Sequence, residues 1–270
     1  MSAMGAHLRP VALLIDVDGV LTQAGVAVPG APAALRALRE REIPFLLVTN
    51  TSQRSRNALA HQLTALGLAV ETDRIITPAV AAARYLAAHG YRAYLATRAE
   101  ARDDFLAAGV VLEDEHPDAV VLGDLGDELT YDRLNRVLRR LLAGAELIAL
   151  GRTRYWQAPD GPAIDVGALA ALFEAAAGVR ARVFGKPEPS IFIEAASMLG
   201  VSPSALAMIG DDAEVDVAAA RRAGLGAGIL VQTGKYRPGD EQRHTPAPDA
   251  VYPSFPSFIA ALLGTPITDQ

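Results

Sequence analysis

Carboxylates follow an apolar run near the start of the chain, where residues 14–22 read LIDVDGVLT. Asp16 and Asp18 are separated by one residue, and Gly19 then permits a tight turn of the backbone. Charged side chains rarely end a buried strand unless they are paired or bind a cation. We therefore expect Asp16 to face an electrophile or a metal ion, and Asp18 to reach an oxygen opposite it. Helix-capping aspartates in a βα turn are the structural alternative for this segment taken alone.

A second acidic cluster follows another apolar run, where residues 207–216 read AMIGDDAEVD. With Asp16, Asp211 would supply the hard oxygen ligands that Mg²⁺ prefers, and waters would complete the octahedron. Asp216 lies further along and is placed to orient a metal-bound water. The favourable dipole of a helix N-terminus explains Asp212 and Glu214 well, but it accounts poorly for Asp211.

Thr49 and Asn50 follow the apolar residues 46–48, again at the end of a predicted strand. Thr49 offers a hydroxyl, and both residues offer backbone N–H groups where a helix is expected to begin, which is a suitable place for a phosphate. Capping of that helix by Thr51 or Ser52 is the structural alternative.

Lys186 lies between a glycine and a proline, in the sequence Phe-Gly-Lys-Pro at 184–187. A loop of this kind holds the lysine in place, and its compact ammonium would neutralise a phosphate or steady the aspartate. A solvated loop lysine is the alternative. Four such segments in this order, each at a strand end or in a neighbouring loop, form a far more specific pattern than any one of them.

The elements that must position these residues alternate along the chain. We predict strands at 11–15, 43–48, 92–96, 119–122, 146–150, 206–209 and 227–231. We predict helices at 31–42, 52–66, 80–89, 131–143, 167–177, 190–199 and 213–223. Continuous apolar strands separated by helices indicate an α/β fold with a parallel sheet covered on both faces. The interval between residues 79 and 183 is long enough for an inserted domain, which would divide a core domain into 1–78 and 184–270.

Composition limits the class of protein. The chain has 270 residues, 51% of them hydrophobic and 21% charged, so a folded domain is expected and disorder is not. The net charge of −6 argues against a nucleic-acid partner. The absence of cysteine excludes disulfides, thiolate metal sites and a cysteine nucleophile. No apolar run is long enough to span a membrane, so we expect a soluble, cytoplasmic protein with no membrane partner.

The four segments, read together, resemble the motifs of phosphatases of the haloacid dehalogenase superfamily. Asp16 to Leu21 resembles the first motif, Thr49-Asn50 the second, Lys186 the third, and Gly210 to Asp216 the fourth. Residues 232–237, Gln-Thr-Gly-Lys-Tyr-Arg, extend the similarity towards the C-terminus. Within that group, the chain resembles the subfamily of phospholysine phosphohistidine inorganic pyrophosphate phosphatases and the related haloacid-dehalogenase-like domain-containing protein 2.

The resemblance implies a Rossmann-like, doubly wound core with an inserted α/β cap, and a role for each motif residue. Asp16 would be the nucleophile, and Asp18 the general acid and base. Asp16, Asp211 and the backbone carbonyl of Asp18 would bind Mg²⁺. Thr49, Asn50 and Lys186 would bind the phosphate, with Asp212 or Asp216 behind the metal ligands. A small phosphorylated substrate is implied, and so is a homodimer joined through the cap.

One departure concerns the cap. Where many capped relatives carry an asparagine–aspartate pair, the sequence reads Gly-Arg-Thr-Arg-Tyr-Trp at 151–156. Arg152 or Arg154 could meet an anionic substrate and Trp156 could pack on it, or the loop could be ordinary cap surface. Two other functions stay open, namely metal-independent dehalogenation on the same scaffold and a non-catalytic phospholigand-binding module. The natural substrate is left open among phosphoamino acids, pyrophosphate, sugar phosphates and nucleotide monophosphates.

Overall fold

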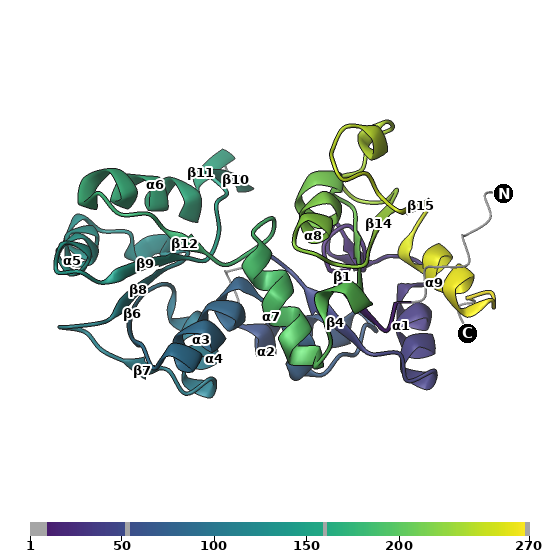
Figure 1. Cartoon of the computed structure of the whole chain (residues 1–270), viewed down its shortest axis with the longest axis horizontal. Coiled ribbons are helices and arrows are strands. Elements are labelled where there is room, and N and C mark those ends of the chain that lie inside the picture. The colour runs from purple at the N-terminus through teal and green to yellow at the C-terminus, as the bar shows by residue number, and fades with distance from the viewer. Residues whose placement is uncertain (1–9, 52–54, 159–160, 268–270) are drawn as a thin grey trace. The chain divides into compact units, whose positions relative to one another are not determined.

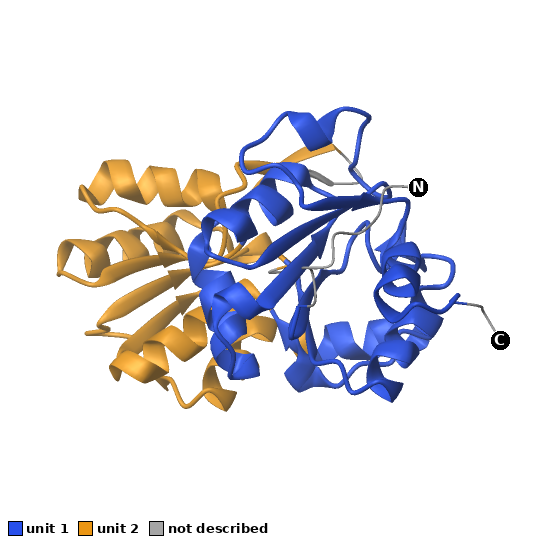
Figure 2. Ribbon diagram, turned by 45° about the vertical axis from the view of Figure 1, so that its right-hand side comes forward, with its two compact units in different colours: residues 1–49, 57–76, 186–270 blue, residues 50–56, 77–185 orange. Residues whose placement is uncertain are grey.

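The computed structural model describes residues 10–51, 55–158 and 161–267. The chain divides into two compact units, which Figure 2 shows in different colours. Unit 1 contains residues 1–49, 57–76 and 186–270, and unit 2 contains residues 50–56 and 77–185. The predicted limits of a separate cap domain, at 78/79 and 183/184, stay a prediction.

Unit 1 is built on a six-stranded parallel sheet with the order β15-β14-β13-β1-β4-β5. Its central strand β1 has five residues that are all buried, as expected for a strand covered on both faces. The strands of unit 1, including a two-stranded ribbon of β2 and β3, are β1 (Ala12–Asp16), β2 (Thr22–Gln23), β3 (Val26–Ala27), β4 (Phe45–Val48), β5 (Ile75–Ile76), β13 (Leu206–Gly210), β14 (Ala227–Val231) and β15 (Ala250–Tyr252).

Helices cover both faces of this sheet (Figure 1). Alternate strand residues such as Leu13, Ile15 and Leu47 pack against α1, α2 and α9 in one apolar core. On the other face, α7 contacts β4, and α8 with the π-helical turn before it contacts β14. These elements are α1 (Ala31–Glu40), α2 (Arg56–Ala65), α7 (Pro189–Leu199), the π turn (Ala213–Ala218), α8 (Ala219–Arg222) and α9 (Phe255–Leu263). The predicted doubly wound parallel sheet is confirmed.

Unit 2 has its own five-stranded parallel sheet, with the order β12-β9-β8-β6-β7. One face of it packs on α5 and α6 through residues such as Tyr94, Leu147 and Phe173. Its strands are β6 (Arg92–Ala96), β7 (Val111–Leu112), β8 (Ala119–Leu122), β9 (Glu146–Ala149), β12 (Arg182–Val183) and the hairpin β10 (Tyr155–Ala158) and β11 (Gly161–Ile164). Its helices are α3 (Pro78–His89), α4 (Arg102–Ala107), α5 (Tyr131–Leu142) and α6 (Val166–Ala177).

Each predicted strand and helix has a counterpart whose ends differ by up to a few residues, whereas helices α4 and α9 were not predicted. The helix predicted at 52–66 begins at Arg56, and the one predicted at 213–223 starts with a π-helical turn. The sequence analysis did not predict the two-residue strands or the β10–β11 hairpin, because so few residues carry little periodicity. Among the described residues, no helix combines the length and hydropathy required to cross a membrane.

Candidate active site

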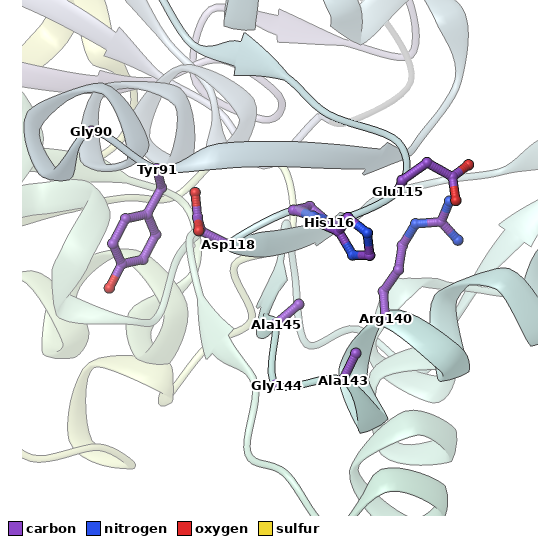
Figure 3. Close-up of a pocket in the computed structure, with 10 residues that line it drawn as sticks. Gly90, Tyr91, Glu115, His116, Asp118, Arg140, Ala143, Gly144 and Ala145 are labelled. Carbon is purple, nitrogen blue, oxygen red and sulfur yellow. The ribbon is translucent and has the colours of Figure 1, made fainter.

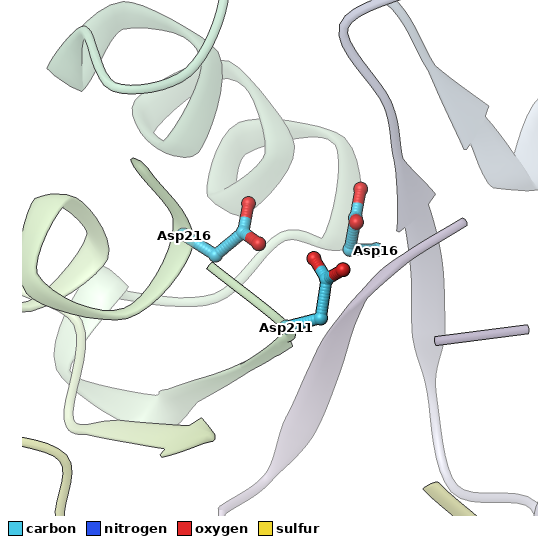
Figure 4. Close-up of side chains that lie close together, drawn as sticks. All are labelled: Asp16, Asp211 and Asp216. Carbon is cyan, nitrogen blue, oxygen red and sulfur yellow. The ribbon is translucent and has the colours of Figure 1, made fainter. Parts of the chain in front are cut away.

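Three aspartate carboxylates converge at the carboxyl edge of the unit 1 sheet (Figure 4). Asp16 ends β1, Asp211 directly follows β13, and Asp216 lies in the π-helical turn after it. Because β1 and β13 are adjacent and parallel, with Ile15 opposite Ile209, their ends bring Asp16 and Asp211 together. One oxygen from each of the three carboxylates lies within 4.8 Å of the others, and all three residues are buried.

Lys186 places its ammonium among these carboxylates. The Nζ atom donates to Asp16 Oδ1, lies 2.8 Å from Asp216 Oδ1, and donates to the carbonyl of Val48 at 3.2 Å. The side chain is 4% exposed, so water screens these charges little. Three carboxylates and one ammonium leave the buried cluster negatively charged, which favours an additional cation.

Burial controls the protonation of the cluster. Desolvation, together with the charges of Asp216 and Asp211, raises the pKa of Asp16 to about 7 in spite of the opposing effect of Lys186. Desolvation likewise raises the pKa of Asp211 to about 6, against the hydrogen bond from the Lys235 N–H. Burial by itself lowers the pKa of Lys186, but the charges of Asp16 and Asp216 outweigh it and raise that pKa above its ordinary value. The lysine is therefore charged at neutral pH, whereas Asp16 and Asp211 can exchange protons for a metal ion near neutral pH.

The residues present fit a magnesium ion. Asp211 Oδ2 accepts a hydrogen bond from the Lys235 N–H at 2.6 Å, whereas Asp211 Oδ1 is buried and has no hydrogen-bond partner among the described residues. A buried carboxylate oxygen without a partner is costly, and a cation would satisfy it. Carboxylate oxygens are also the ligands that Mg²⁺ prefers. The chemistry of the donor set therefore agrees with the predicted cofactor.

Asp18 is exposed, and among the described residues its side chain is not part of this group of three carboxylates. Its Oδ1 accepts a hydrogen bond from Thr22 Oγ1 at 3.2 Å. Gly19 makes the turn with φ of +91°, and its N–H donates to the carbonyl of Thr22 at 2.6 Å. The turn thus leaves the Asp18 carboxylate in contact with solvent, two residues after Asp16, and its predicted role as acid and base stays a prediction. The predicted binding of a metal ion by the Asp18 carbonyl stays a prediction.

Thr49 directly follows β4, in which Val48 pairs with Asp16. Thr49 is buried, and its N–H donates to the carbonyl of Ile76 at 3.2 Å. Its hydroxyl, and not its N–H, is therefore the candidate donor to a phosphate. Asn50 is exposed and groups with unit 2, so its predicted contact with phosphate stays a prediction.

The two aspartates placed behind the metal ligands by the sequence analysis differ in their surroundings. Asp216 belongs to the carboxylate cluster and bonds Lys186. Asp212 instead caps the π-helical turn, because its Oδ1 accepts from the N–H groups of Glu214 and Val215 at 3.1 and 2.9 Å. The structure therefore separates a cluster residue from a capping residue.

The sequence analysis assigned no role to the segment 233–235, which follows β14. Thr233 Oγ1 donates to the carbonyl of Gly19 at 2.5 Å, and the N–H of Lys235 donates to Asp211. The sheet topology could have predicted this proximity, because β14 is the next strand after β13 and ends at the same edge of the sheet. No side-chain pattern in the segment would have revealed these contacts.

In unit 2, the structure gives a side-chain partner to one of the cap residues named from the sequence. Arg152 Nη1 bonds Glu174 Oε2 at 3.2 Å, and Arg154 is exposed. The Trp156 side chain lies outside the described residues. A separate pocket of about 560 Å³, lined among others by Tyr91, His116 and Arg140, lies at the amino ends of β6, β8 and β9 (Figure 3). It contains none of the predicted site residues.

Comparisons with known proteins agree with this geometry. The family model described as haloacid dehalogenase-like hydrolase matches residues 13–111, and a related HAD-hydrolase-like model matches residues 183–258. The chain is 38% identical over 252 residues to haloacid dehalogenase-like hydrolase domain-containing protein 2 of Bos taurus, covering 93% of this chain and 95% of that protein. It is 33% identical over 266 residues to phospholysine phosphohistidine inorganic pyrophosphate phosphatase of Xenopus laevis, covering 96% and 97%.

Solved structures of phosphatases also resemble this chain over most of its length. The 4-nitrophenylphosphatase of Thermotoga maritima superposes with a TM-score of 0.84 at 29% identity, covering 94% of this chain and 97% of that one. The p-nitrophenyl phosphatase of Archaeoglobus fulgidus superposes with a TM-score of 0.85 at 28% identity, covering 94% and 99%. The resemblance derived from the four motifs is confirmed, and so is the fold that it implied.

Proposed function

The chain belongs to the haloacid dehalogenase-like hydrolases, and we propose that it is a Mg²⁺-dependent phosphatase acting through an aspartyl-phosphate on Asp16. The observation that carries the proposal is the convergence of Asp16, Asp211 and Asp216 in a buried, negatively charged cluster around Lys186. Phosphoryl transfer through a covalent intermediate requires a nucleophile and a cation that stabilises the charge of the phosphoryl group, and a carboxylate beside an oxygen-rich cation site would provide both.

The reaction has two steps. In the first, a carboxylate oxygen of Asp16 attacks phosphorus, the bond from phosphorus to the leaving oxygen breaks, and Asp18 gives its proton to that oxygen. In the second, Asp18 takes a proton from a water that attacks the phosphorus of the aspartyl phosphate. The phosphorus–Asp16 bond then breaks, inorganic phosphate leaves, and the Asp16 carboxylate is restored.

The remaining residues would bind the metal ion and the phosphoryl group. Asp16, Asp211 and the backbone carbonyl of Asp18 would hold Mg²⁺, with Asp216 beside them, and the ion would supply charge stabilisation for the transferring phosphoryl group. The Lys186 ammonium adds positive charge, and the hydroxyl of Thr49 with the side chain of Asn50 would donate to phosphoryl oxygens. Metal-independent dehalogenation needs neither the acid Asp18 nor the metal ligand Asp211, and no observation favours it.

The substrates we propose are small phosphomonoesters, with phosphoamino acids and pyrophosphate as further candidates. Support comes from the names of the relatives, which include a 4-nitrophenylphosphatase and a phospholysine phosphohistidine inorganic pyrophosphate phosphatase. We also propose a homodimer joined through the cap. Its support is the exposed pair of apolar side chains of Tyr155 and Ile164, which lie opposite each other on β10 and β11.

Hydrolysis of p-nitrophenyl phosphate with and without added Mg²⁺ tests the proposal, using Asp16→Asn and, as a matched control, Asp132→Asn. Asp132 is exposed on α5 and pairs only with Arg136 among the described residues, so its substitution leaves the cluster intact. We expect metal-dependent release of p-nitrophenol by the wild type and the control, and none by Asp16→Asn. Chemical trapping of a phosphorylated wild-type chain, mapped to Asp16, would identify the intermediate.

Other outcomes would overturn specific parts of the proposal. Substantial turnover by Asp16→Asn would remove Asp16 as the nucleophile. Undiminished turnover after removal of divalent cations would remove the metal dependence. Release of halide from a haloacid without added metal would favour the dehalogenase, and binding of phosphorylated ligands without turnover across a substrate panel would favour the non-catalytic module.

A further inference from the structure

The segment 233–235 contacts two parts of the candidate active site that lie far from it in the sequence. The N–H of Lys235 donates to Asp211 Oδ2 at 2.6 Å, and Thr233 Oγ1 donates to the carbonyl of Gly19 at 2.5 Å. One short segment is thus bonded both to a candidate metal ligand and to the turn that carries Asp18.

Two glycines make the approach of Asp211 possible. A methyl group on Gly19 would lie 1.9 Å from Asp211 Oδ2, and one on Gly234 would lie 2.0 Å from the same atom. Both glycines also have positive φ, of +91° and +60°, which other residues rarely adopt. Asp211 Oδ2 is therefore enclosed by backbone on two sides, and no larger residue fits at either position.

This enclosure distinguishes the two oxygens of Asp211. Oδ2 is occupied by the hydrogen bond from Lys235, whereas Oδ1 is buried and lacks a hydrogen-bond partner among the described residues. An oxygen held by an N–H donor fixes the orientation of the carboxylate and directs the other oxygen to the cation. The hydrogen bond from Thr233 to the carbonyl of Gly19 restrains the backbone next to Asp18, because Gly19 directly follows Asp18.

We propose that the segment 233–235 positions two parts of the active site. It orients Asp211 so that Oδ1 binds the cation, and it holds in place the turn that carries Asp18. The inference rests on the proposed function, since it takes Asp211 as a metal ligand and Asp18 as the acid and base. Thr233 and Lys235 act here as positioning residues, through Gly19 and Asp211 respectively.

The first test measures Mg²⁺ binding to the metal-free protein by calorimetry, with Gly234→Ala and the matched control Gly239→Ala. Both glycines have positive φ, but a methyl group at Gly239 meets nothing within 4 Å, whereas one at Gly234 would lie 2.0 Å from Asp211 Oδ2 and 2.5 Å from Gly19 Cα. Of the two variants, only Gly234→Ala therefore disturbs Asp211 and the neighbouring turn. We expect Gly234→Ala to weaken Mg²⁺ binding by about 10- to 100-fold, the usual loss when an outer partner of a metal ligand is disturbed. Gly239→Ala is expected to stay within about threefold of the wild type.

The second test measures kcat and KM for p-nitrophenyl phosphate with Thr233→Val and Thr233→Ser. Valine removes the hydroxyl with little change of shape, whereas serine keeps it. We expect Thr233→Val to lower kcat by about 3- to 10-fold, the effect of losing one hydrogen bond, with KM nearly unchanged. Thr233→Ser is expected to recover most of that loss.

The outcomes separate this inference from the proposed function. Equal Mg²⁺ affinities of Gly234→Ala and Gly239→Ala, in folded proteins, would overturn the role at Asp211. Equal kcat values of Thr233→Val and Thr233→Ser would overturn the role at the Asp18 turn. If the wild type itself neither binds Mg²⁺ nor hydrolyses phosphate esters, the proposed function fails first. Should Gly234→Ala not fold, the Thr233 pair still decides whether the segment positions the acid–base turn.

Discussion

The Nζ atom of Lys186 lies 2.8 Å from Asp216 Oδ1, with both side chains buried. The same ammonium also donates to Asp16, so it joins two carboxylates that would otherwise repel each other. The lysine thus has a structural task before any phosphate arrives, because it offsets part of the charge of the metal-free site. In the proposed reaction, the same ammonium would neutralise charge on the phosphoryl group.

Replacing Lys186 with methionine should destabilise the metal-free protein. The change leaves buried carboxylates without their cation, and breaking a buried ion pair typically costs about 3 kcal/mol or more. We expect the loss in chemical denaturation without metal, and a partial recovery when Mg²⁺ is added, since the ion would replace the missing charge. The control is Arg136→Met on α5, which removes an exposed cation that pairs with the exposed Asp132. Equal stability of the two variants would contradict the prediction.

Asp216 and Asp212 should respond differently to substitution. Asp216→Asn alters a cluster residue, so we expect Mg²⁺ affinity to fall by about tenfold or more, as measured by calorimetry. Asp212→Ala removes the cap of the π-helical turn, so we expect a loss of about 1 kcal/mol in the free energy of unfolding and a smaller change in affinity. Equal losses of affinity would show that both aspartates support the metal.

Magnesium binding should weaken as the pH falls. Burial raises the pKa of Asp16 to about 7 and that of Asp211 to about 6 in the metal-free protein, so protons occupy these carboxylates in the range where a metal needs them ionised. Lowering the pH from 8 to below about 6 therefore favours the proton over Mg²⁺, and affinity falls. Calorimetry in buffers with different ionisation enthalpies measures the protons released, and a constant affinity with no release would contradict this.

The sequence was sufficient to predict the four longest strands of the core sheet, and it placed Asp16, Asp211 and Asp216 at one site, with Asp216 as the residue that orients a metal-bound water. The apolar runs that became β1 and β13 are continuous, which is the signal of strands buried on both faces. Parallel strands end at a common edge, so placing Asp16 and Asp211 at two strand ends already implied that they meet. The parallel arrangement of the strands was therefore sufficient to predict that Asp16 and Asp211 lie close together.

The remaining features depend on contacts that no local pattern specifies. Asp216 lies in a π-helical turn after β13, whereas an ordinary helix was predicted from the same residues. Thr49 directs its N–H to Ile76 because β5 pairs with β4, and β5 has only two residues. The hydrogen bond from Lys235 to Asp211 joins backbone to side chain, so the identity of the lysine says nothing about it.

The hydrogen bond from Thr22 to Asp18 leads to the last prediction. Thr22 is buried, and its Oγ1 donates to Asp18 Oδ1 at 3.2 Å, which holds the proposed acid–base carboxylate in one orientation. Thr22→Val should therefore lower kcat for p-nitrophenyl phosphate by about 3- to 10-fold, with Mg²⁺ affinity unchanged because Asp16 and Asp211 are not touched. Thr22→Ser keeps the hydroxyl and should retain most of the activity. If valine and serine lowered kcat equally, packing at Thr22, and not its hydroxyl, would be what Asp18 requires.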